Sequence, residues 1–286
     1  MAAEDSEKDS GSGFQIGALR SHISMTIHTY HALRMWKGRR PAGKLPGIIG
    51  LAGYLLMTNR MIRGAALDDP YSDFWMLRVE EKIDDVKANL TVLKDQATIA
   101  FESVPATLNL GENLNMQPAD LTVFANSPLG FLGIYLVADY DELVRKTILA
   151  HHTALIDRQT MVHWLDDGGH HLRSLFTLVQ RYQYSGAKRD DFAANNAAAR
   201  SALEKFGTLP QDILEGTRRS RFAPYIHRDR LPRNAPMTDD ADEDITAEVS
   251  EEKLFEGAAE SEEDTGADAA SEIDPSREEN TEADQP

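Results

Sequence analysis

The segment 76–104, MLRVEEKIDDVKANLTVLKDQATIAFESV, has the most regular pattern in the chain. Its apolar residues follow one another at steps of three and four, which is the spacing of one face of a helix close to four heptads long. Charged residues fill the positions between them. The pattern predicts a long helix packed on the rest of the body, and the alternative is a helix that also mediates self-association. The apolar positions are Met76, Val79, Ile83, Val86, Leu90, Leu93, Ala97, Phe101 and Val104.

The segments around this helix predict a mostly α-helical fold with a minor β component. Ser72 or Asp73 is the expected N-cap of the long helix, and Pro105 ends it. A short strand is expected near residues 121–124. Further helices are expected at 47–67 and 129–155, and two helical pieces are expected at 157–186 around Gly168 and Gly169. Another helix is expected at 190–207, with Asp190 as its cap and Gly207 as its stop. From residue 209 onward, a helix start at a proline is followed by an irregular basic arm.

The segment 22–30, HISMTIHTY, alternates apolar and polar residues and predicts a half-buried strand at the N-terminus. Ile23, Met25 and Ile27 fall on one face, while polar side chains that can bond to base edges fall on the other. The segment 36–47, WKGRRPAGKLPG, follows and predicts a basic loop. A two-stranded ribbon fits the major groove of DNA, so a strand next to a basic loop suggests a surface for double-stranded DNA.

Charge segregation supports that suggestion, because no Asp or Glu occurs between Ser10 and Leu67 while eight bases occur from Phe14 to Leu67. A second basic stretch lies at 216–233, and arginine, whose planar fork suits phosphate and guanine, dominates both. The alternative is an edge strand followed by a solvated basic loop. The candidate nucleic-acid-binding residues are Arg20, His22, Ser24, Thr26, His28, Arg34, Lys37, Arg39, Arg40, Arg218, Arg219 and Arg221.

Catalytic and metal-binding motifs are missing from the sequence. There is no GxSxG elbow, no GxxxxGK[ST] phosphate loop and no HExxH pair. The chain has no cysteine, which excludes disulfides and thiolate zinc sites and fits a reducing compartment. His163, Asp167, His170 and His171 could converge on a metal, but ordinary surface histidines explain them more simply. We therefore expect no enzyme, no metal and no cofactor.

The net charge of -17 is unevenly distributed, because residues 238–286 hold 20 acids and 2 bases. That composition predicts an acidic disordered tail, and residues 1–13 a disordered leader. Between them, 14–237 is expected to form a single mostly helical body. Its first part, 14–104, holds the strand, basic loop and helices, and 105–237 forms a helical second half. The N-terminus lacks the apolar core of a secretory signal, which favours the bacterial cytoplasm.

The order strand, helix, turn, helix is that of ribbon-helix-helix repressors, in which two chains pair their strands antiparallel in the DNA groove. The second helix would then meet phosphates with its N-terminus, here residues 71–74. One departure is a strand-to-helix connection of about ten residues, where that fold uses only a few.

Blocks of sequence throughout the body resemble a protein family carried by bacterial integrating conjugative elements, which is grouped with AcaB-like transcriptional regulators of conjugative plasmids. They include ALRSHISMTIHTYHALRMWKGRR, DDPYSDFWMLRVEEKI, SPLGFLGIYLVADYDELVRK and LPQDILEGTRRSRFAP. The resemblance spans about residues 14–225. It implies a ribbon-helix-helix-related homodimer that binds DNA and regulates transfer genes, with the strand at 21–29 as the reading element. The alternative function is a non-enzymatic scaffold component of the conjugation machinery, whose basic surface meets an acidic protein or the inner membrane surface.

Overall fold

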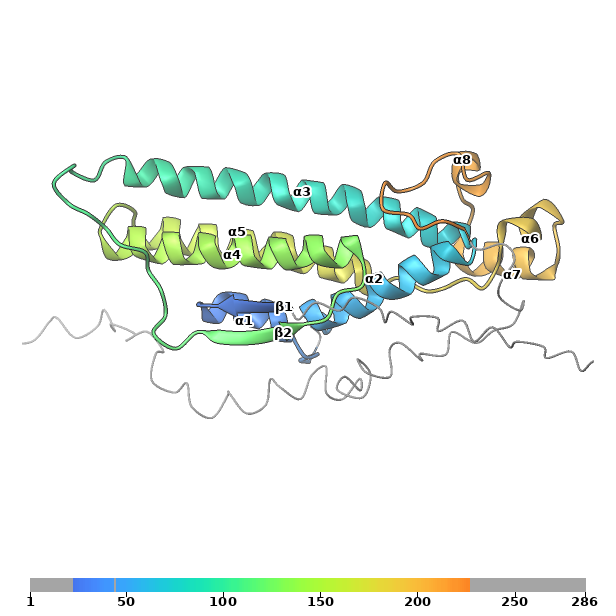
Figure 1. Cartoon of the computed structure of the whole chain (residues 1–286), viewed down its shortest axis with the longest axis horizontal. Helices are drawn as coiled ribbons and strands as arrows, with labels where there is room; N and C mark the ends of the chain where they lie inside the picture. The colour runs from blue at the N-terminus through green and yellow to red at the C-terminus, as the bar shows by residue number, and fades with distance from the viewer. Residues whose placement is uncertain (1–22, 44, 227–286) are drawn as a thin grey trace, which may run out of the picture.

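A computed structural model describes residues 23–43 and 45–226, a part of the chain that holds eight helices and one two-stranded sheet (Figure 1). The leader, the acidic tail, Arg20 and His22 therefore lie outside the described residues. The fold is mostly helical with its strand first, as predicted. The elements are β1 Ile23–Ile27, α1 Tyr30–Lys37, α2 Leu51–Ala66, α3 Pro70–Phe101, β2 Ala119–Val123, α4 Pro128–His152, α5 Arg158–Gln180, α6 Arg189–Ala193, α7 Ala197–Phe206 and α8 Gln211–Leu214.

The long helix α3 lies along one side of the molecule, with α4 and α5 beside it and β1, β2 and α1 on the side away from α3 (Figure 1). Its apolar stripe from Met76 to Ala97 is buried in the core of this chain. Packing of the stripe within the chain is confirmed, and additional self-association through this helix stays a prediction. The N-cap is Asp69, which accepts a hydrogen bond from the Tyr71 backbone, and not Ser72 or Asp73. Pro70 explains the difference, because proline fits the first helical position.

Helix α5 is continuous through Gly168 and Gly169, so the prediction of two helical pieces was wrong. The glycines are there for close packing against α4. A Cβ atom on Gly168 would lie 3.0 Å from the Tyr140 ring, and one on Gly169 would lie 2.8 Å from the Arg173 guanidinium. Tyr140 fills this space and donates a hydrogen bond to the Leu165 carbonyl. Glycine lowers helix propensity, but tertiary packing outweighs that cost here.

The segment 190–207 forms two helices, α6 and α7, where one was expected. Asn195 adopts a positive φ of 47°, and the Asn196 side chain then caps α7 by accepting from the Ala199 amide. Asparagine tolerates this left-handed conformation better than most residues, which allows the chain to turn between the helices. The N-cap of α6 is Lys188, not Asp190. Gly207 ends α7 at a φ of 83°, as predicted.

Strand β1 pairs antiparallel with β2, with Met25 opposite Leu121. Met25 and Ile27 are buried and Ser24 is exposed, which confirms the predicted alternation. The strand stops at Ile27, however, and α1 begins at Tyr30 inside the segment that was predicted to be strand and then loop. Thr29 is the reason: its side chain caps α1, and its amide and hydroxyl both donate to Asp141 on α4, at 2.9 and 2.8 Å.

The short helix α1 changes how the N-terminal half compares with the ribbon-helix-helix order. Only two residues, His28 and Thr29, connect β1 to α1, where the sequence had indicated about ten residues before the next helix. The strand is therefore tightly connected to its first helix, whereas residues 38–50 separate that helix from α2. The long connection inferred from the sequence was wrong because α1 itself had been counted as loop.

Candidate nucleic-acid interface

The exposed face of the β1–β2 ribbon is rich in hydroxyl groups. Ser24 lies opposite Thr122 and Thr26 lies opposite Asp120, and all four residues are exposed. The Thr26 hydroxyl donates to an Asp120 carboxylate oxygen at 2.6 Å, so this pair is preordered across the ribbon. Hydroxyls bond to either donors or acceptors on base edges, and a carboxylate accepts from the cytosine amino group. The face therefore presents groups that can read bases.

His28 follows the ribbon and is partly engaged in holding the chain. Its Nδ1 accepts from the Asn115 backbone amide at 3.3 Å, and its carbonyl accepts from the Asn115 side chain at 3.2 Å. Its own amide points to the Asp141 carboxylate. The structure thus places His28 at the junction of β1, α1 and the loop before β2, next to the two exposed hydroxyl residues of β1.

The predicted basic loop is an ordered small hairpin between α1 and α2. Arg39 and Ile48 exchange two backbone hydrogen bonds of 2.8 Å, and Ala42 and Leu45 close the turn. Gly38 adopts a φ of 76°, and a Cβ there would lie 2.5 Å from the Ile48 carbonyl oxygen. The Gln180 side chain of α5 accepts from the Ile49 amide and fixes the hairpin to the body. Its arginines are therefore held on a rigid support.

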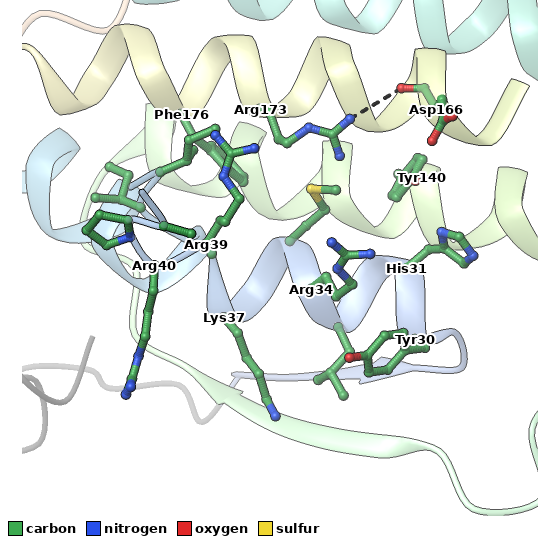
Figure 2. Close-up of a pocket in the computed structure, with 17 residues that line it drawn as sticks. Tyr30, His31, Arg34, Lys37, Arg39, Arg40, Tyr140, Asp166, Arg173 and Phe176 are labelled. Carbon is green, nitrogen blue, oxygen red and sulfur yellow. Dashed lines mark hydrogen bonds between the residues drawn. The ribbon is translucent and has the colours of Figure 1, made fainter. Parts of the chain in front are cut away.

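Beneath this hairpin lies a pocket of about 760 Å³, formed by α1, the hairpin, α4 and α5 (Figure 2). Arg34, Arg39 and Arg173 extend into it, whereas Lys37 and Arg40 extend away from the body (Figure 2). Its apolar lining comes from α1, the hairpin segment, α4 and α5, and Asp166 of α5 adds an acidic residue. The lining includes Leu33, Met35, Ile48, Ile49, Tyr140 and Phe176.

The five cations around this pocket, defined here as the basic cluster, are Arg34, Lys37, Arg39, Arg40 and Arg173. Among the residues that the structure describes, no carboxylate lies within ion-pair distance of any of them. Arg173 donates to the Asp166 backbone carbonyl at 3.5 Å instead. Burial lowers the pKa of His31, and the Arg34 charge lowers it further, against an opposing effect of Asp166. The cluster is thus a concentration of uncompensated positive charge.

Sequence reasoning missed Arg173 as a member of the cluster. Arg173 follows Gly169 by four residues on α5, so the two lie on one helix face. The absence of a side chain at Gly169 leaves room for the guanidinium. The pair GxxxR could have suggested a positioned arginine, but nothing in the sequence joins α5 to the hairpin.

The arginines of the C-terminal arm, residues 215–226, are arranged differently. Arg219 forms bonds of 2.8 and 3.0 Å with the two oxygens of Asp73, which is fully buried on α3. Arg221 pairs with Glu80 and Asp84, and Arg218 pairs with Glu81. The sequence predicted all three arginines as DNA contacts. That role stays a prediction, and the structure places each one against a carboxylate of α3, which compensates its charge.

The described part of the chain contains neither a metal-ligand cluster nor a membrane-spanning helix. Within 23–43 and 45–226, no group of three or more His, Asp or Glu residues could hold a metal ion. His171 lies 3.7 Å from Asp167, and in the described residues His163 and His170 complete no metal-holding group with them. In the same part of the chain, none of the helices has the length and apolar character needed to cross a bilayer.

Comparisons with known proteins show the family to which this chain belongs. A family model described as transcriptional regulator AcaB matches residues 15–227. Among solved structures, selenomethionine-containing AcaB from uropathogenic E. coli is similar, with a TM-score of 0.46 and 14% identity over 69% of this chain and 98% of that chain. No match to a curated protein was found. Because the family model matches well over half of the length of this chain, the chain belongs to the AcaB family of transcriptional regulators.

Proposed function

We propose that this protein is a homodimeric, non-enzymatic regulator that binds double-stranded DNA in the bacterial cytoplasm and controls transfer genes of an integrating conjugative element. The observation that supports this most directly is a juxtaposition. The hydroxyl face of β1 and four of the five cations of the basic cluster come from one segment without acids, residues 23–48. A reading element and a phosphate-binding element are thereby fixed to one another by a two-residue connection.

The two parts have different roles in this proposal. The hydroxyls of Ser24 and Thr26, with the neighbouring Asp120, contact base edges, because a two-stranded ribbon fits the major groove. Lys37 and Arg40, which extend away from the body, contact backbone phosphates (Figure 2). Phosphate contacts position the protein and base contacts specify the sequence. The C-terminal arginines are left out of the interface, since their partners on α3 already compensate their charge.

The dimer in this proposal pairs β1 with β1 of a second copy. In the described residues the sheet has only two strands, so the edge of β1 away from β2 has no strand beside it. An open strand edge is a template for pairing with another chain. Antiparallel pairing of two such edges would place two hydroxyl faces side by side on one DNA site.

A second candidate function, a scaffold component of the conjugation machinery, is favoured by one observation. The connection between α3 and β2 exposes apolar side chains of Leu108, Leu114 and Met116, the last of which is 95% exposed. Scattered exposed apolar residues are normal, but three within nine residues of one loop suit a protein partner better than DNA. That partner would be recognised without base-specific contacts.

The experiment that separates the two functions is a gel-shift series with promoter fragments of the element and shuffled fragments of equal length. A regulator binds one fragment at least tenfold more tightly than its shuffled copy. The double substitution Lys37→Gln and Arg40→Gln should weaken binding to both DNAs alike. Equal, weak binding to every fragment by the unaltered protein would contradict the regulator and favour the scaffold.

A further inference from the structure

The pocket inside the basic cluster has properties that the surface of a DNA-binding protein does not require. Its volume of about 760 Å³ lies in the range of pockets that hold small ligands. A cube of that volume would be only about 9 Å on a side. A DNA duplex, whose major groove alone is about 12 Å wide, is too thick to enter it.

Three guanidinium groups converge on this space from three separate elements. Arg34 comes from α1, Arg39 from the hairpin and Arg173 from α5 (Figure 2). The Nε atom of Arg39 is shielded from solvent and has no hydrogen-bond partner among the described residues. Like charges repel, and Asp166 is the one acid in the lining, so the three arginines leave an excess of positive charge that favours a bound anion. Arginine forks match the geometry of a phosphate group.

The same pocket has an apolar side. Phe176 and Ile49 are buried and line it from below the hairpin, and Met35 contributes from α1. Tyr30 is 55% exposed at the rim, where its ring can stack on a planar group. A pocket that combines a phosphate-sized cationic end with an apolar and aromatic side fits a ligand with both features.

The packing around Arg173 indicates that the cationic end is built into the fold. Its guanidinium lies where a Cβ of Gly169 would be 2.8 Å away, next to the Tyr140 hydroxyl. Burial raises the pKa of Tyr140 to about 12, so this hydroxyl stays neutral and adds no negative charge. Arg173 is therefore held by glycine and tyrosine packing, and its charge remains available to the pocket.

From these observations we propose that the pocket binds a small molecule that carries a phosphate group on a planar ring system, of the nucleoside monophosphate class. The phosphate lies between Arg34, Arg39 and Arg173, and the ring lies against the exposed Tyr30 at the rim on the side of Arg34 (Figure 2). Binding to the pocket does not depend on the proposed DNA function.

The test is calorimetric titration of the full chain with adenosine monophosphate, adenosine and inorganic phosphate. Adenosine monophosphate should bind, and the other two should bind at least about tenfold more weakly, because each lacks one half of the recognition. Arg173→Gln and the exposed-residue variant Arg34→Gln should each reduce affinity for adenosine monophosphate at least about tenfold. Arg158→Gln, the same change about 22 Å away along α5, should leave it unchanged.

Several outcomes would overturn the proposal. They are no heat with adenosine monophosphate up to millimolar concentration, equal binding of inorganic phosphate, or unchanged affinity in both folded arginine variants. Displacement of adenosine monophosphate by a random-sequence duplex would assign the pocket to the DNA backbone instead and would also overturn it. Circular dichroism of each variant verifies folding. Because the readout is ligand binding, a failure to bind DNA leaves this test unaffected.

Discussion

The two arginine-rich regions of this protein look alike in sequence and differ in structure. In the basic cluster, no carboxylate of the described residues lies within ion-pair distance of Arg34, Lys37, Arg39, Arg40 or Arg173. In the C-terminal arm, Arg218, Arg219 and Arg221 all pair with carboxylates of α3. The difference shows that the number of arginines in a segment does not indicate an available charge. What decides is whether the fold places acids opposite them.

The helix faces that lie opposite the two groups of arginines explain why only one group is compensated. Helix α3 carries acids on the face away from its apolar stripe, including Glu80, Glu81 and Asp84, and the arm lies along that face. The basic cluster faces the glycines of α5 and Tyr140 of α4, and Asp166 accepts a hydrogen bond from Arg173 through its backbone carbonyl. Compensated arginines stabilise the fold, and uncompensated arginines are available to bind a ligand.

The largest expected effect concerns Arg189, which shares Asp73 with the arm. Arg189 donates to Asp73 at 2.6 Å and to Asp68 at 2.7 Å, and it is 8% exposed. Burial lowers the pKa of Arg189, but its bonds to the two carboxylates outweigh burial and raise it. Arg189→Met should lower the free energy of unfolding by about 3 kcal/mol. This is the lower end of the range for breaking a buried pair, because Asp73 keeps Arg219.

Chemical denaturation measures that loss, with Arg173→Met as the matched control from the basic cluster. Arg173 has no carboxylate partner among the described residues, so its substitution should change the unfolding free energy by no more than about 0.5 kcal/mol. Equal losses in the two variants would show that the contrast between the regions has no energetic basis.

The second prediction compares the two regions as DNA contacts. Lys37→Gln with Arg40→Gln should weaken binding to all DNA sequences and lower the slope of log affinity against log salt by about 1.8, roughly 0.9 for each phosphate that the protein no longer neutralises. Arg218→Gln with Arg221→Gln removes the same charge, but each of these arginines would first have to leave a carboxylate. We expect that slope to change by less than about 0.5. Fluorescence anisotropy over a salt series measures both slopes.

The sequence predicts the secondary structure of this molecule better than the contacts between residues far apart in the chain. The apolar stripe of α3 and the alternation of β1 were predictable because each follows the period of its element. Helix α1 was missed although its signals were present: a Thr29 cap, apolar Ala32 and Met35, and a Gly38 stop. The segment was interpreted by its charge rather than its period. The pairing of Arg219 with Asp73 was not predictable, because 146 residues separate them and no local pattern records the contact.

The third prediction concerns the ribbon. Ser24→Ala and Thr26→Ala should reduce the preference for the cognate fragment by about 1 kcal/mol each, near the lower end for a base contact, and should hardly change affinity for shuffled DNA. Neither hydroxyl is buried, so stability should be unaffected. Competition gel shifts give the preference. A matched control is Thr91→Ala on α3, whose hydroxyl donates to the Lys87 carbonyl of its own helix. Equal losses on both DNAs would assign the ribbon to phosphate contact or to none.

The smallest effect is expected from the acidic segment 238–286, which lies outside the described residues and holds 20 acids and 2 bases. It follows the arm, but the arginines of the arm already have partners on α3, so its charge should act on the basic cluster instead. Tethering gives it an effective concentration that can reach millimolar. A chain shortened to residues 1–237 should therefore bind random DNA several-fold more tightly at low salt. The gain should disappear as salt screens the charges over about 10 Å at 0.1 M.

In the Lys37→Gln and Arg40→Gln background the same shortening should have a smaller effect, because two of the competing cations are gone. If the gain persists unchanged in that background, the acids act elsewhere and the uncompensated cluster is not their target.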